Sequence, residues 1–97
     1  MTTYLDHILV AHRETASLDG RLLEGLLDSA SSGEPPRGFI QALAGGTSDE
    51  IAVIAEVKRR SPSRGDLDTG LDPAIVAGQY ATGGAACLSV LTDESFF

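Results

Sequence analysis

Residues 51–65 constrain the possible folds of this chain more than any other stretch. The stretch begins with an aliphatic run that ends in two charges, Ile51-Ala-Val-Ile-Ala-Glu-Val-Lys58, and closes with a turn, Ser61-Pro-Ser-Arg-Gly65. Such a dense run of Ile, Val and Ala is typical of a strand that is buried on both faces of a parallel sheet. Because side chains alternate along a strand, Glu56 and Lys58 share one face at its carboxyl end. Parallel α/β folds bind ligands at that end, so the two charges predict a site for a polar ligand.

The residues that follow predict a helix and a second strand. Asp72-Pro73 is a helix start, with Asp as the N-cap and Pro at the first helical position, and Gly83-Gly84 ends the helix. The apolar run over residues 85–91 then predicts a second buried strand. A strand, a polar loop over residues 59–71, a helix and a strand make one right-handed βαβ unit with a parallel pair of strands. This order assigns the chain to the α/β class.

The first half of the chain predicts helices. Thr2 or Thr3 can cap a helix through about Ala16, and Ser17 can cap a second helix whose leucines recur at three- and four-residue steps. A short helical turn is expected over residues 39–44, and residues 45–49 lead into the first strand. We therefore expect residues 1–50 to form a helical N-terminal extension and residues 51–97 to form a βαβ unit.

A single parallel pair leaves two strand edges unpaired and buries little apolar surface for a chain of 97 residues. We therefore expect this unit to be incomplete: the front portion of a larger α/β barrel or doubly wound domain.

Composition excludes several classes of function. A formal net charge of −7 argues against nucleic acid or an anionic membrane as the main partner. Four of the seven basic residues nevertheless lie between Lys58 and Arg64, which suits a small anion.

Cys87 lies in an apolar run and is expected to be a small buried hydrophobe. His12 has no partners at metal spacing, so no metal site is expected. With no membrane-length apolar run and no signal-peptide pattern, the expected location is the cytoplasm.

Several segments together resemble indole-3-glycerol phosphate synthases. They are Ile54-Ala-Glu-Val-Lys58, Ser61-Pro-Ser-Arg-Gly65, Asp72-Pro73, Gly83-Gly84-Ala85 and Leu88-Ser-Val-Leu-Thr-Asp-Glu94 with Phe96-Phe97. The resemblance covers about residues 3–97. It implies the N-terminal part of a (β/α)8 TIM barrel, through the second strand, with a helical N-terminal extension. It also implies decarboxylation and ring closure of 1-(2-carboxyphenylamino)-1-deoxyribulose 5-phosphate in tryptophan biosynthesis, a phosphorylated aromatic substrate and no cofactor.

The resemblance also implies roles for five residues. Lys58 would contact anionic groups of the substrate, and Glu56 would position and charge-balance the lysine acids. Ser61 would help to hold the substrate, while Pro62 and Phe97 would form apolar walls around its ring. The family's principal acid on the third strand, a later glutamate and the phosphate loops all lie outside these 97 residues. We therefore expect the chain alone to be inactive.

Other interpretations stay open. Glu56 and Lys58 can be an exposed ion pair at a strand end, which stabilises a fold only slightly. Arg59, Arg60 and Arg64 are expected to be solvated loop charges. The leucine-rich second helix and the open strand edges also suit a non-catalytic module that associates with itself or with a complementary barrel fragment. A different phosphate-binding barrel, such as the neighbouring isomerase of the pathway, does not fit the Glu-x-Lys-x-x-Ser-Pro-Ser pattern.

Overall fold

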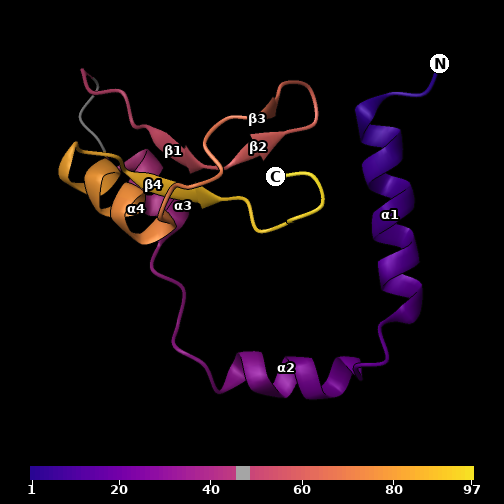
Figure 1. Ribbon diagram of the computed structural model, residues 1–97. Coiled ribbons are helices and arrows are strands. Elements are labelled where there is room, and N and C mark those ends of the chain that lie inside the picture. Colours follow the sequence, from indigo (N-terminus) through magenta and orange to yellow (C-terminus); the bar gives the residue numbers. More distant parts are fainter. Residues whose placement is uncertain (46–48) are drawn as a thin grey trace. The chain divides into compact units, whose positions relative to one another are not determined.

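The computed structural model describes residues 1–45 and 49–97. The chain divides into two compact units, residues 1–36 and residues 37–97. The first unit holds helices α1 (Tyr4–Leu18) and α2 (Leu23–Ser31). The second holds α3 (Phe39–Ala44), β1 (Ile54–Val57), β2 (Arg60–Ser61), β3 (Gly65–Asp66), α4 (Pro73–Thr82) and β4 (Cys87–Val90), all labelled in Figure 1.

Helix α1 begins where the sequence predicts. Thr3 is its N-cap, and the hydroxyl of Thr3 accepts a hydrogen bond from the backbone N–H of Asp6 at 3.2 Å. The carboxylate of Asp6 accepts in return from the backbone N–H of Thr3 at 2.7 Å. This reciprocal capping box satisfies two backbone donors that a helix start leaves without partners. Hydrogen bonds from the backbone and then the hydroxyl of Thr3 also lower the pKa of Asp6.

The predicted start of the second helix at Ser17 is wrong. Helix α1 continues to Leu18, and the Ser17 hydroxyl donates to the carbonyl of Glu14 at 2.7 Å inside it. Helix α2 begins six residues after Ser17, at Leu23, without a side-chain cap. The reason is local: the Asp19 carboxylate accepts from the backbone N–H of Arg21 at 3.0 Å and from its guanidinium, which holds the intervening residues in a turn.

The second unit contains the predicted βαβ arrangement. Strands β1 and β4 are parallel, with Ile54 opposite Cys87 and Val57 opposite Val90. Helix α4 connects them and contacts both strands, and α3 contacts β4. Figure 1 shows the two strands side by side with α4 next to them. The helical turn predicted at residues 39–44 is confirmed as α3. Most of the linker predicted at residues 45–49 lies outside the described residues.

Burial is lower than the prediction of a strand buried on both faces. In β1 only Val57 is buried, with 3% of its surface exposed, and Ile54 is 48% exposed. Cys87, at 9%, is buried as predicted for a small hydrophobe. The prediction of burial on both faces is therefore wrong for the described residues. The described helices α3 and α4 cover only part of two strands of four residues each.

Helix α4 has the predicted ends. The Asp72 carboxylate accepts from the backbone N–H of Ala74 at 2.9 Å and of Ile75 at 3.3 Å, and Pro73 occupies the first helical position. Gly83 is the C-cap, and Gly84 follows with a φ of 97°, a conformation that favours glycine.

The loop predicted over residues 59–71 contains a small hairpin. Strands β2 and β3 pair antiparallel, with Arg60 opposite Asp66 and Ser61 opposite Gly65. The Ser61 hydroxyl accepts from the backbone N–H of Arg64 at 3.2 Å and so closes the turn. Turn residues were visible in the sequence, but two-residue strands have no periodicity that could reveal their pairing.

Candidate active site

An ion pair stands at the carboxyl end of β1. The Lys58 ammonium lies 2.9 Å from a carboxylate oxygen of Glu56, and the two side chains keep 36% and 45% of their surface exposed, respectively. This contact agrees with the prediction that both residues share one face. An ion pair this exposed stabilises a fold by about 1 kcal/mol at most. The carboxyl end of a parallel strand, where the pair lies, is also the end at which parallel α/β folds bind ligands.

Backbone hydrogen bonds hold the strand end that carries the pair. The Tyr80 hydroxyl, from α4, donates to the Glu56 carbonyl at 3.2 Å. One residue on, the carbonyl of Val57 accepts from the backbone N–H of Leu91 at 3.0 Å. Helix α4 and the residue that follows β4 thus hold the backbone at Glu56 and Val57, immediately before Lys58.

Ser61 and Pro62 lie in the hairpin that follows. Ser61 is in β2, Pro62 is in the turn between β2 and β3, and both are half-buried. The Ser61 hydroxyl that the resemblance assigns to substrate accepts the Arg64 amide of the turn. These two residues are thus placed by the hairpin, a few residues beyond the pair.

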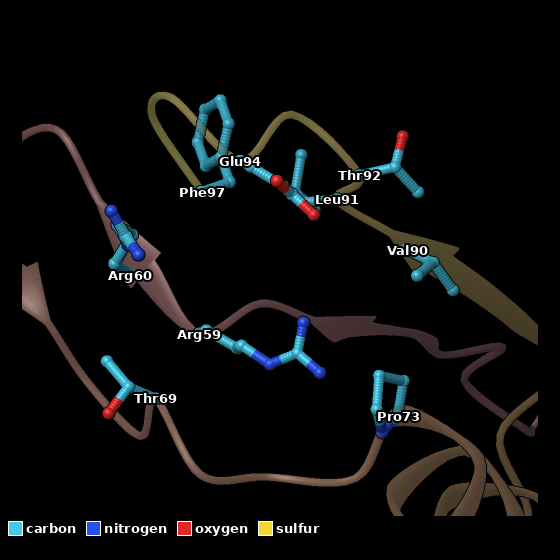
Figure 2. A pocket seen from close by; sticks show the side chains of 9 residues that line it. All are labelled: Arg59, Arg60, Thr69, Pro73, Val90, Leu91, Thr92, Glu94 and Phe97. Carbon is cyan, nitrogen blue, oxygen red and sulfur yellow. The ribbon is translucent and has the colours of Figure 1, made fainter.

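Phe97 connects the loop after β4 with the residues that follow β1. Its carbonyl accepts from the backbone N–H groups of Arg59 at 3.3 Å and Arg60 at 3.1 Å. Its half-buried side chain contributes to a pocket of about 540 Å³ at the carboxyl ends of β1 and β4 (Figure 2). The residues that line it are Arg59, Arg60, Thr69, Pro73, Val90, Leu91, Thr92, Glu94 and Phe97.

Of the five predicted site residues, only Phe97 lines this pocket. The structure brings Glu56 and Lys58 into contact with each other, and places Ser61 and Pro62 in the hairpin. Arg59 and Arg60 are exposed, as expected for solvated charges. Both also line the pocket, which was not predicted. No sequence pattern indicated this, because Arg59 lies in a bend after β1, where side-chain alternation no longer gives a direction.

The part of the chain that the structure describes holds no group of three or more His, Cys, Asp or Glu side chains that could bind a metal ion. None of its helices has the length and apolar character needed to cross a membrane.

Comparison with known proteins gives a consistent result. The family model for indole-3-glycerol phosphate synthase matches residues 6–97. Indole-3-glycerol phosphate synthase of Hyphomonas neptunium is 45% identical, over 100% of this chain and 38% of that protein. The synthases of an Arthrobacter species and of Burkholderia vietnamiensis are 46% and 47% identical, over 36% and 38% of their own lengths. The chain thus spans little more than a third of the length of these relatives.

Proposed function

The chain belongs to the indole-3-glycerol phosphate synthase family, and from this premise we propose that it supplies the first two strands of a (β/α)8 barrel with that activity. In this proposal residues 1–50 are the helical extension and residues 51–97 begin the barrel. The reaction is the decarboxylating ring closure of 1-(2-carboxyphenylamino)-1-deoxyribulose 5-phosphate in tryptophan biosynthesis.

The observation that carries the proposal is the Glu56–Lys58 ion pair at the carboxyl end of β1. Active sites of (β/α)8 barrels are built at this end of the strands. The substrate carries a carboxylate and a phosphate, so a lysine there lowers the free energy of the bound anion. Ring closure also needs an acid near the ketone oxygen, because an aromatic carbon is a weak nucleophile.

We assign the two charges separate roles. The Lys58 ammonium contacts an anionic group of the substrate, and the Glu56 carboxylate, 2.9 Å away, fixes the position of that ammonium and balances charge among the acids of the site. Since Tyr80 and Leu91 hold the backbone immediately before Lys58, the pair is oriented before substrate arrives.

The other three residues have supporting roles in this proposal. Ser61 contributes a hydroxyl that helps to hold the substrate, and Pro62 and Phe97 contribute apolar surface beside its ring. All three are half-buried, which suits side chains that cover a ligand from one side.

The proposal is tested in a chimera in which residues 1–97 replace the matching part of the Hyphomonas neptunium relative. We expect the chimera to form indole-3-glycerol phosphate, and Lys58→Met and Glu56→Gln each to lower kcat/KM about 100-fold, a typical loss for a positioned acid–base or electrostatic group. The 97-residue chain alone is expected to show no turnover.

Arg64→Gln is the matched control for charge. Arg64 is exposed and lies in the same basic cluster, but its side chain has no assigned role, so kcat/KM should stay within about twofold. Full activity in Lys58→Met, or an equal loss in Arg64→Gln, would contradict the assignment of the pair.

A further inference from the structure

Of the residues that line the pocket at the carboxyl ends of β1 and β4, only Phe97 has a substrate-contacting role in the function above. We propose that this pocket is a separate binding site for a small organic monocarboxylate whose acid group is attached to an apolar group. The proposal does not depend on the synthase activity, because it rests on residues other than the Glu56–Lys58 pair.

The pocket lies beside the start of α4. A terminal nitrogen of the Arg59 guanidinium donates to the carbonyl of Leu71 at 3.3 Å, immediately before α4. Val57, two residues earlier, is buried, and α4 contacts β1. Pro73, the first residue of α4, lines the pocket as well. Neither member of the pair lines the pocket.

The polar lining suits one negative charge. The hydrogen bond to Leu71 uses one of the five N–H donors of the Arg59 guanidinium. The forked geometry of a guanidinium matches the two oxygens of a carboxylate. Arg60 adds a second positive charge, which is 3.8 Å from Asp66. The Glu94 carboxylate also lies in the lining and repels a second negative charge on a ligand, so a monoanion is favoured over a dianion.

The remaining lining suits an apolar group. Pro73, Val90, Leu91 and Phe97 supply carbon surface, and Thr69 and Thr92 supply hydroxyls. Figure 2 shows the Arg59 side chain extended toward Pro73, with Val90 on the neighbouring strand and Phe97 on the loop beyond it. A volume of about 540 Å³ lies within the range of small-molecule sites, which combine apolar walls with a few polar groups.

Backbone hydrogen bonds hold the walls together. The Phe97 carbonyl accepts from Arg59 and Arg60, and the Phe97 amide donates to the Asp93 carbonyl at 2.8 Å. The Arg59 carbonyl accepts from Leu67 at 2.9 Å and from Asp68 at 3.0 Å. These bonds join three separate stretches of chain. The site is therefore largely ordered before a ligand binds, and binding costs little conformational entropy.

The test is an amide NMR titration of the 97-residue chain with phenylacetate. We expect saturable shifts at Arg59, Arg60 and Thr92. Acetate should bind at least fivefold more weakly, because it lacks the apolar group, and inorganic phosphate should also bind more weakly, because of Glu94. Phenethylammonium should cause no saturable shifts. Arg59→Gln should weaken phenylacetate binding at least fivefold.

Two controls locate the site. Arg64→Gln removes an exposed arginine outside the lining, and Lys58→Gln removes the cation of the pair; both should bind phenylacetate as the unmodified chain does. An equal loss in Arg64→Gln, a loss in Lys58→Gln, or shifts centred on Glu56 and Ser61 would overturn the proposal. So would a spectrum without dispersion or without saturation. If Arg59→Gln disturbs the fold, the shift map of the unmodified chain decides alone.

Discussion

At the scale of single residues, several charged side chains of this chain find partners two or three positions away. Glu56 pairs with Lys58 at the end of β1, Asp19 pairs with Arg21 between the first two helices, and Asp6 bonds back to Thr3. Partners this close in sequence meet in one local backbone conformation, so they specify where a helix or strand begins or ends. In Glu56 and Lys58 the same local geometry also presents two opposite charges to solvent.

The Asp19–Arg21 pair predicts an acid titration. Hydrogen bonds from the Arg21 guanidinium, and then from its backbone N–H, lower the pKa of Asp19 to about 2. A carboxyl whose pKa falls on folding contributes its stabilisation above its unfolded value of 3.8 and loses it as the pH falls through about 2. We expect the carboxyl carbon of Asp19 to titrate in NMR with a midpoint near 2.

Arg21→Gln should return this midpoint toward 3.8, since an amide carries no charge to favour the carboxylate. Arg13→Gln, in the middle of α1, is the matched control and should leave it near 2. A midpoint of 3.8 in the unmodified chain would show that the turn between α1 and α2 is not held by this pair.

At the scale of elements, the second unit depends on how α4 starts and stops. Asp72 caps its first turn, and Gly83 and Gly84 reverse the chain so that β4 can lie parallel to β1. Gly84 has a φ of 97°, whereas Gly78 sits inside the helix with open space where a side chain would be. A side chain is therefore accommodated at position 78 and strained at position 84.

Two alanine substitutions should show this. Gly78→Ala is expected to raise the free energy of unfolding by about 1 kcal/mol, because alanine is the better helix former and nothing obstructs its methyl group. Gly84→Ala is expected to lower it by about 1–2 kcal/mol, because a side chain is strained at positive φ. Urea unfolding of both variants measures the difference, and a change of the same sign in both would contradict the described end of α4.

Sequence reasoning succeeded for elements whose ends carry strong local signals. Four features were predicted from residue type and spacing: Thr2 or Thr3 as the cap of α1, Asp72 as the cap of α4, Gly83-Gly84 as a stop and the parallel order of the two strands. It failed at Ser17, where a cap residue was available but the Asp19–Arg21 bonds placed the turn further along the chain. The β2–β3 hairpin and the pocket depend on hydrogen bonds between distant segments, which no local pattern encodes.

At the scale of the whole molecule, most of the apolar surface that the structure describes is uncovered. Val57 and Cys87 are the buried hydrophobic residues of the described part, whereas Ile54 in β1 and Val90 in β4 are about half exposed. Leucines of α2 are exposed too, among them Leu23 at 69% and Leu27 at 57%. Apolar surface of this extent favours association with another polypeptide. A second copy of this chain and the remainder of a barrel are the two partners that the proposals above suggest.

We predict that the remainder of a barrel is preferred. A separate polypeptide that corresponds to the part of the Hyphomonas neptunium relative beyond the matched residues should bind the 97-residue chain one to one. It should slow amide hydrogen exchange in β1 and β4 at least tenfold, because new strands would pair with their open edges and cover Ile54 and Val90.

Ile54→Asp should weaken binding at least tenfold, because it places a charge in that contact. Ser63→Asp, in the exposed hairpin turn, is the matched control and should bind normally. Analytical ultracentrifugation distinguishes the one-to-one complex from a dimer of the 97-residue chain. If the chain forms dimers and does not bind the added polypeptide, its exposed surface serves self-association and the barrel proposal loses its structural basis.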